Sequence, residues 1–289
     1  MEEQSVPLLL RARWLGRIAY REAWTFQQAL ADARAAGLLL EDQLLLLEHD
    51  EVLTLGRNAR EAHVRALPEV LAARGIEVVR VERGGEVTYH GPGQLVAYPV
   101  VALLSPGVLG RLETGPFERR PLGVRTFVEA LEGAMVDTCA AAGIAAGPRP
   151  GHPGCWVDAD GPLPRKVGAL GIRVARGVAF HGIALNVTTN LADFDLIDPC
   201  GMPGLRTTSL ARERARAGIA AADAYAPPTT ASVADAAAAF APALAHRLGL
   251  AIAGDLPPAA DPDAERRALQ ALVDGFERSP GRLASAGAR

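Results

Sequence analysis

The sequence predicts an α/β or α+β fold, a single domain with one mixed central sheet and helices on its flanks. Short apolar runs with strand character crowd the middle of the chain, over 44–101 and again over 166–187. Apolar residues at helical spacing occupy the segments around them, over 25–36, 124–142 and 232–248. Sheets that bury their faces under helices are typical of such layered domains.

The first half of the chain holds short segments that favour regular structure. The apolar runs 44–47 and 52–55 flank a polar turn and indicate a strand hairpin. Residues 68–74 are predicted to form a short helix. The runs 76–81 and 95–101 are predicted strands, and a glycine-rich loop joins them.

The second half alternates between loops and longer elements. Residues 104–123 contain several prolines and glycines and are expected to form a long connecting segment. The helix over 124–142 is the clearest of the chain, because its apolar residues keep a helical period and a glycine follows. Residues 145–165, dense in proline and glycine, are expected to be loop, interrupted by Cys155, Trp156 and Val157. Two strands follow, over 166–175 and 178–187, with a tight turn between them.

The helix over 232–248 is expected to close a domain that spans residues 1–253. From 254 to 289 the chain is rich in proline and alanine, so we expect a tail that is partly disordered, above all in its last ten residues.

The composition is that of an ordinary globular protein, with 49% hydrophobic and 22% charged residues. The formal net charge is -3 and no basic stripe dominates, which argues against nucleic-acid binding. Arg212, Arg214 and Arg216 form one local cluster, which we expect to be a solvated face or a contact for an acidic carrier protein.

The three cysteines are an odd number in a long chain, so they do not indicate a disulfide framework. The sequence begins without a basic segment and has no apolar run of membrane-spanning length. We therefore expect a soluble cytoplasmic protein that does not bind a membrane.

The most informative segment covers residues 83–98 and has the sequence RGGEVTYHGPGQLVAY. Its four glycines allow a ligand to approach the main chain, and exposed amides in such a loop can hold an acyl carbonyl or a phosphate. A plain glycine-proline hairpin would explain the glycines. It would not explain arginine, threonine, tyrosine, histidine and glutamine at fixed offsets among them, so the segment predicts a functional loop.

This segment resembles the signature of the lipoyl(octanoyl) transferase family: R-G-G, two free positions, T, an aromatic residue, H, then G-P-G-Q and an aromatic residue in the next strand. Two further blocks match in order. KVGALGIR at 166–173 is followed by FHGIALNV at 180–187, and IDPCG at 197–201 is followed by TSL at 208–210. The resemblance covers about residues 20–250.

The resemblance implies the fold of biotin and lipoate protein ligases, with an octanoyltransferase catalytic domain in residues 1–253. It implies transfer of an octanoyl group from octanoyl-acyl carrier protein to a lysine of a lipoyl carrier domain. Such domains occur in 2-oxoacid dehydrogenase complexes and in the glycine-cleavage H protein. Neither a cofactor nor a metal is expected, since one thioester becomes another and no ATP is needed.

Cys200 lies between Pro199 and Gly201, which fix a turn and should display its thiol. A buried structural cysteine is the alternative. By resemblance Cys200 is the nucleophile that carries the acyl group as a thioester. Lys166 begins an otherwise apolar strand, where a lysine is unusual. By resemblance it favours the thiolate of Cys200 and serves as general acid and base.

The same resemblance implies an acyl site with two walls. Small residues beside leucine and isoleucine should form a narrow apolar slot, in which each buried methylene contributes ~0.8 kcal/mol. The residues are Arg83, Gly84, Gly85, Glu86, Val87, Thr88, Tyr89 and His90 on one wall, and Ala169, Leu170, Gly171, His181, Gly182, Ile183 and Ala184 on the other. We expect both histidines to line the site, with a core role for His181 or a Cys200–His181 dyad as alternatives.

Three other functions remain open at this point: an ATP-dependent lipoate or biotin ligase of the same fold, a cysteine hydrolase, and a binding module without activity. Cys139 lies on the apolar face of its helix and should be core. Cys155 departs from the family pattern and could be a second exposed thiol. Together with His152 it offers only two ligands, too few to indicate a metal site.

Overall fold

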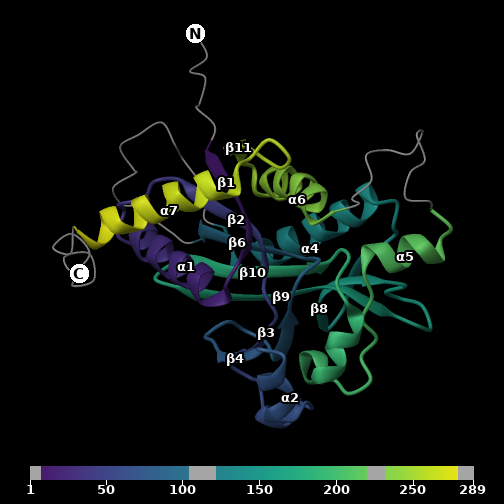
Figure 1. Cartoon of the computed structure of the whole chain (residues 1–289). Coiled ribbons are helices and arrows are strands. Elements are labelled where there is room, and N and C mark those ends of the chain that lie inside the picture. The colour runs from purple at the N-terminus through teal and green to yellow at the C-terminus, as the bar shows by residue number, and fades with distance from the viewer. Residues whose placement is uncertain (1–7, 104–121, 220–231, 279–289) are drawn as a thin grey trace.

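The structure is a computed structural model, which describes residues 8–103, 122–219 and 232–278 (Figure 1). Its centre is a mixed eight-stranded sheet, and a separate three-stranded sheet lies below it in the view of Figure 1. The strands of the large sheet are, in spatial order, β11 (Ala251–Ala253), β1 (Leu9–Ile18), β2 (Asp42–His49), β6 (Gln94–Ala102), β10 (Val178–Asn186), β9 (Arg165–Ala175), β8 (His152–Val157) and β7 (Gly147–Arg149). The predicted mixed sheet is confirmed.

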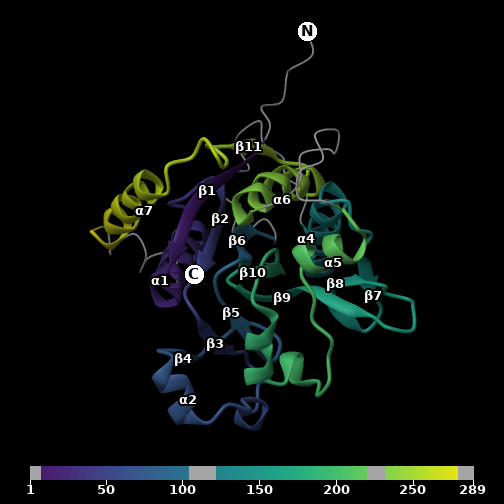
Figure 2. The same cartoon turned by 45° about the vertical axis from the view of Figure 1, so that its right-hand side comes forward.

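Helices cover both faces of the large sheet, as Figures 1 and 2 show. The helices of the described residues are α1 (Tyr20–Ala35), α2 (Pro68–Ala73), α4 (Val124–Ala141), α5 (Leu210–Arg216), α6 (Val233–Leu248) and α7 (Pro262–Glu277), with 3-10 turns η1 (Glu61–His63), η2 (Leu191–Leu196) and η3 (Pro199–Gly201). Of these, α4 and α6 cover one face of the large sheet and α1 and α7 the other, while α2 packs against the small sheet. Leu44 and Leu46 of β2 pack into the core that α4 and α6 cover, and Leu45 and Leu47 pack beneath α1 and α7. A strand buried on both faces explains the continuous leucine run.

The small sheet has its own core. Its strands are β3 (Val52–Leu55), β4 (Glu77–Arg80) and β5 (Val87–His90), with β3 parallel to β4 and antiparallel to β5. Leu53 and Leu55 of β3 are buried with Leu71 of α2, Tyr89 of β5 and Phe194 of η2. This sheet holds the glycine-rich segment at one end of the large sheet.

Most predicted elements are present. The helices predicted over 25–36, 68–74, 124–142 and 232–248 are confirmed as α1, α2, α4 and α6, although α1 begins earlier. The strands predicted over 76–81, 95–101, 166–175 and 178–187 are confirmed as β4, β6, β9 and β10. The predicted tight turn is confirmed too: Arg176 and Gly177 have φ of 49° and 77°, the pattern of a two-residue hairpin turn.

Three predictions were wrong. The segment between the strands predicted over 76–81 and 95–101 was expected to be a loop, but it contains β5, which pairs with β3. The runs 44–47 and 52–55 are strands, but they do not form a hairpin, because β2 pairs with β1 and β6 while β3 belongs to the small sheet. The predicted loop 145–165 contains β7 and β8, an antiparallel pair at the edge of the large sheet. An edge strand tolerates the prolines and glycines that favoured a loop. Residues 104–121 of the predicted connecting segment lie outside the described residues.

Four α-helices or strands of the described residues were not predicted at all: β1, α5, β11 and α7. Asp261 caps α7 by accepting from the amides of Asp263 and Ala264, and Leu269 and Val273 are buried in the core that α1 covers. The ordered helix therefore occupies much of the segment for which we expected a tail; the last ten residues lie outside the described ones.

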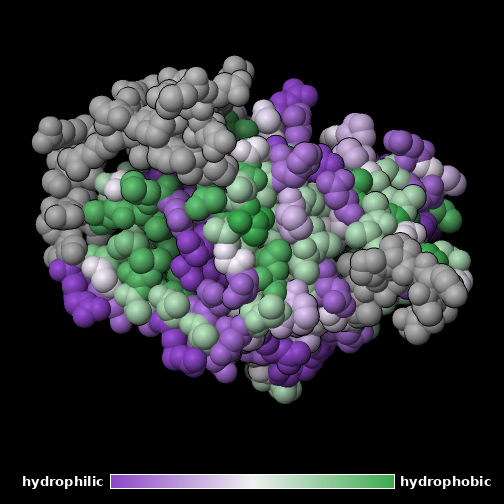
Figure 3. All heavy atoms as spheres, turned by 90° about the horizontal axis from the view of Figure 1, so that it is seen from above, coloured by the Kyte–Doolittle hydropathy of each residue, from purple (hydrophilic) through white to green (hydrophobic). Residues whose placement is uncertain are grey.

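The view from above shows hydrophilic and hydrophobic residues intermingled over the described surface, with hydrophobic ones gathered toward the left (Figure 3). Within the residues that the structure describes, no helix has the length and apolar character to cross a membrane. Arg214 of the predicted solvated cluster is buried instead, and its Nη1 donates to the carbonyl of Ala142.

Candidate active site

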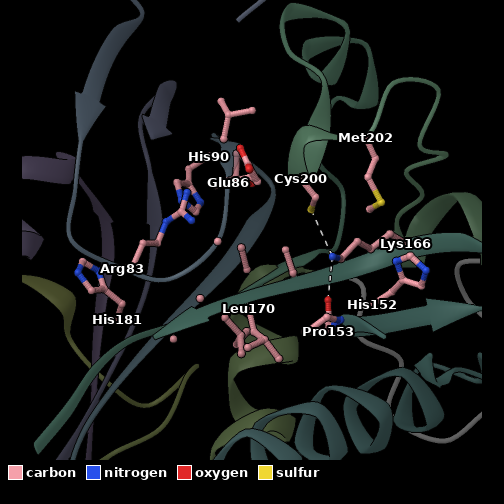
Figure 4. Close-up of a pocket in the computed structure, with 18 of the residues that line it drawn as sticks. Arg83, Glu86, His90, His152, Pro153, Lys166, Leu170, His181, Cys200 and Met202 are labelled. Atoms are coloured by element: carbon pink, nitrogen blue, oxygen red, sulfur yellow. Dashed lines mark hydrogen bonds between the residues drawn. The ribbon is translucent and has the colours of Figure 1, made fainter. Parts of the chain in front are cut away.

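A cavity of about 260 Å³ opens where β9 and β10 meet the glycine-rich segment 83–90 and the turn η3. Figure 4 shows Cys200 and Lys166 at one end of this cavity, His181 at the other, and Leu170 on the wall between them. The large sheet, the small sheet and η3 thus all contribute side chains to one site.

Lys166 and Cys200 are in direct contact. The Nζ of Lys166 lies 3.3 Å from the Sγ of Cys200 and donates to the carbonyl of Pro153 at 2.8 Å (Figure 4). The same ammonium lies 5.2 Å from the ring centroid of Trp156, within cation–π range. Lys166 is only 7% exposed, and within the described ranges it forms no ion pair with a carboxylate. A buried ammonium needs a compensating partner, and a Cys200 thiolate would supply one.

The backbone explains why these two residues meet. The Lys166 amide donates to the carbonyl of Arg206, and its carbonyl accepts from the amide of Thr208, so the segment after η3 runs beside β9. Cys200 has a φ of 57°, and Gly201 follows with a φ of 66°. A left-handed non-glycine residue is strained, and such strain is concentrated at functional sites. The predicted turn around the thiol is present.

Gly154 leaves the space that the Lys166 side chain fills. A Cβ atom at this position would lie 2.4 Å from the carbonyl oxygen of Gly168 and 2.7 Å from the Cε of Lys166, and the φ of Gly154 is 129°. A larger residue would therefore displace the lysine.

Arg83 is a buried cation held by neutral oxygens. Its Nη2 donates to the carbonyl and the Oγ1 of Thr54, at 3.0 and 2.8 Å, and its Nη1 donates to the carbonyl of Gly84. Burial lowers the pKa of Arg83. The Gly84 amide donates to the carbonyl of Ile172, which ties the loop to β9. This close approach requires Gly171, where a Cβ would lie 2.7 Å from the Gly84 oxygen.

Neutral histidines form part of the cavity wall. His90 Nδ1 lies 2.8 Å from the Oε1 of Gln94, whose amide group donates to Tyr89 and Asn186, so Nδ1 carries the proton. Burial, reinforced by His49 and Arg83, holds the pKa of His90 well below its usual value. His90 is therefore a neutral hydrogen-bonding group at neutral pH.

His49, which the sequence analysis did not single out, supports the same wall. Its Nδ1 lies 2.9 Å from the carbonyl of Ile18 and its Nε2 lies 2.8 Å from the hydroxyl of Tyr98. Burial lowers the pKa of His49 to about 4. Its ring lies against those of Tyr20 and His90, which both line the cavity.

His181 is not brought to Cys200. It has a φ of 59° and is 1% exposed, and its ring nitrogens make no hydrogen bond within the described residues. The nearest acid is Glu82, 3.7 Å from Nε2. Burial lowers the pKa of His181. Since Figure 4 places it at the opposite end of the cavity from Cys200, this geometry does not support the alternative Cys200–His181 dyad.

Thirteen of the fifteen predicted substrate-binding residues line the cavity: Arg83, Gly85, Glu86, Val87, Thr88, His90, Ala169, Leu170, Gly171, His181, Gly182, Ile183 and Ala184. The other two, Gly84 and Tyr89, do not. Gly84 contacts β9 through its backbone instead. Tyr89 points the other way, because alternate side chains of β5 face opposite sides. Its ring packs on Phe194 and its hydroxyl donates to Asp193.

Several residues that line the cavity were not predicted to do so. They are Tyr20, Tyr98, Gly151, His152, Pro153 and Met202. Tyr98 lay inside the quoted signature segment, which was a usable signal, whereas the others follow from tertiary packing. Cys155, which the sequence left open as a second exposed thiol, is fully buried. Its Sγ lies 3.8 Å from that of Cys139, which is core as predicted. Among the described residues, no group of three or more potential ligands could hold a metal.

Residues 19–226 match the family model described as the lipoyl protein ligase A/B catalytic domain. The chain is 45% identical to an octanoyltransferase of Acidobacterium capsulatum over 207 residues, 71% of this chain and 81% of that protein. It is 42% identical to an octanoyltransferase of Mycolicibacterium gilvum, over 72% of this chain and 77% of that protein.

Among solved structures, the fold is similar to that of lipoate-protein ligase A bound with ATP, with a TM-score of 0.61 and 14% identity over 92% of this chain and 95% of that one. It is also similar to protein Ta0514 of T. acidophilum, a lipoate protein ligase by its description, with bound lipoic acid. The TM-score is 0.59, with 14% identity over 91% of this chain and 95% of that one. At this identity the likeness concerns the fold alone, and it confirms the ligase-like architecture predicted above.

Proposed function

The chain belongs to the lipoyl protein ligase A/B catalytic-domain family, and we propose that its site transfers an octanoyl group by way of an acyl-cysteine at Cys200. The protein is an acyltransferase, an octanoyltransferase of protein lipoylation, and lipoyl-domain proteins are its acceptors. The donor is octanoyl-acyl carrier protein. The acceptors are lipoyl domains of 2-oxoacid dehydrogenase complexes and the glycine-cleavage H protein. The observation that carries the proposal is the 3.3 Å contact between Lys166 and Cys200.

In the first half-reaction, the Cys200 thiolate attacks the carbonyl carbon of the donor thioester. A new C–S bond forms, the old C–S bond breaks, and the carrier sulfur leaves as a thiolate. The ammonium of Lys166 gives that sulfur a proton and becomes a neutral amine. Its contacts with Pro153 and Trp156 hold the nitrogen beside Cys200 during this exchange.

In the second half-reaction, the acceptor lysine loses one proton to the neutral Lys166 and attacks the acyl-cysteine. The C–N bond forms, the C–S bond breaks, and Cys200 leaves as a thiolate. The amide nitrogen gives up a second proton to solvent. The enzyme is then back in its starting protonation state, with thiolate and ammonium paired.

The octanoyl chain lies along the cavity from Cys200 past Leu170. Ala169, Ile183 and Ala184 add apolar surface to this slot. Each methylene that leaves water contributes ~0.8 kcal/mol, so burial of a medium-length chain contributes several kcal/mol to the free energy of binding.

A cytoplasmic location of the protein stays a prediction from the sequence.

The alternative is an ATP-dependent ligase, since solved proteins of the same fold include lipoate ligases, one of them bound with ATP. Incubation with octanoyl-acyl carrier protein and a lipoyl domain, with and without ATP, separates the two reactions. The proposal predicts transfer without ATP and none from free octanoate plus ATP. Transfer that requires ATP would contradict it.

A further inference from the structure

We propose that Glu86 binds the ε-ammonium group of the acceptor lysine before the second half-reaction. This inference rests on the proposed function and adds to it a residue that selects the acceptor rather than the acyl donor. It starts from the charges of the cavity: in the described part of the chain, Glu86 is the only carboxylate among the residues that line it, and the cations Lys166 and Arg83 line it too.

Glu86 lies next to the nucleophile. A Cβ atom built on Gly201, the residue after Cys200, would be 3.1 Å from the Cδ of Glu86 and 3.0 Å from the Cε1 of His63. Figure 4 shows Glu86 and Cys200 on the same side of the cavity, facing Leu170. A lysine that attacks the acyl-cysteine must therefore pass close to this carboxylate.

The carboxylate is oriented and yet open on one side. His63 Nδ1 lies 3.2 Å from Oε2 of Glu86, while Oε1 makes no hydrogen bond with any described residue. The backbones on both sides are anchored, because Gly56 donates to the carbonyl of Glu86 and Asp198 donates to that of His63. The Glu86 side chain is 25% exposed, so a side chain that enters from outside can reach Oε1.

The chemistry requires such a group only in the second half-reaction. A free lysine side chain has a pKa of about 10.4, so the acceptor arrives as an ammonium ion at neutral pH. Burial beside the cation Arg83 disfavours this ammonium ion, and a neighbouring carboxylate offsets that cost. Bound at Glu86, the ammonium passes one proton to the neutral Lys166, and the amine attacks the thioester. The octanoyl thioester itself is neutral and has no use for a carboxylate.

The test compares two nucleophiles on the same acyl-enzyme. Wild type and Glu86→Gln are loaded with octanoyl-acyl carrier protein, and discharge is followed with a lipoyl domain below saturation and with hydroxylamine, which is neutral at pH 7. Glutamine keeps the size and the contact with His63 and removes the charge. The ratio of the lipoyl-domain rate to the hydroxylamine rate should fall about tenfold in Glu86→Gln, equivalent to about 1.4 kcal/mol.

The matched control is Glu61→Gln, which removes an exposed carboxylate of η1 that lies outside the cavity and pairs with Arg80 at 3.5 Å. Its rate ratio should equal that of wild type. An unchanged ratio in Glu86→Gln, or an equal fall of both rates, would overturn the role of Glu86. A wild-type enzyme that does not load at all would instead refute the proposed function.

Discussion

Replacement of Gly154 by alanine tests whether the position of Lys166 controls acyl transfer, without touching either reacting residue. The added Cβ would lie 2.7 Å from the Cε of Lys166. Ordinary contact between carbon atoms is about 3.5–4.0 Å, so the lysine side chain must move by roughly 1 Å. The Nζ–Sγ distance of 3.3 Å would then exceed the range of a hydrogen bond to sulfur.

A displacement of about 1 Å in a reacting group can lower a rate by roughly a hundredfold. We therefore expect the Gly154→Ala enzyme to load Cys200 about a hundred times more slowly than wild type. It should also lose stability, because alanine at a φ of 129° is strained and its Cβ would press on the carbonyl of Gly168.

The assay is the rate of acyl-cysteine formation from octanoyl-acyl carrier protein, measured by quenched mass spectrometry on protein whose folded fraction is known from circular dichroism. The control is Gly75→Ala, since Gly75 has a positive φ of 68° and its Cβ would meet nothing within 4 Å. This control should lose about 1–3 kcal/mol of stability and load at the wild-type rate. Wild-type loading by folded Gly154→Ala would refute the reasoning.

Three further predictions follow from the same geometry. Leu170→Ala removes apolar surface from the wall beside the chain and should lower kcat/KM for the octanoyl donor by roughly tenfold, about the value of two methylenes; an unchanged kcat/KM would place the chain elsewhere. Burial lowers the pKa of His49 from 6.5 to about 4, so below pH 6.5 the unfolded chain binds more protons than the folded one. Roughly 3 kcal/mol of the free energy of unfolding should therefore be lost between pH 6.5 and 4. Urea titrations of His49→Gln should show a smaller loss over the same pH range. Truncation after residue 260 removes the buried side chains of Leu269 and Val273 and should lower the free energy of unfolding by about 3–6 kcal/mol, whereas an unchanged urea midpoint would show that α7 contributes nothing.

The elements that the sequence predicted well are those with a local signal. Helices such as α4 and α6 repeat apolar residues every turn, and the hairpin of β9 and β10 has a glycine in its turn. Strand pairing has no such signal. The run 52–55 was recognised as a strand but assigned to the wrong partner, since only tertiary contacts decide that β3 joins the small sheet.

The candidate site divides in the same way. The family signature brought Lys166 and Cys200 together although 34 positions separate them, and their contact is in the structure. It misplaced Tyr89, because a motif does not tell which side chains of a short strand face the cavity. His63 gave no signal in the sequence, since its place beside Glu86 depends on how η1 folds against the segment that carries Cys200.

The central claim is that Cys200 carries the acyl group. Intact-mass spectrometry after mixing with octanoyl-acyl carrier protein tests it directly, on wild type and on Cys200→Ser. The account predicts a hydroxylamine-sensitive adduct of about 126 Da on wild type only, which disappears as an added lipoyl domain gains the same mass. No adduct on wild type, or an equal adduct on Cys200→Ser, would contradict it.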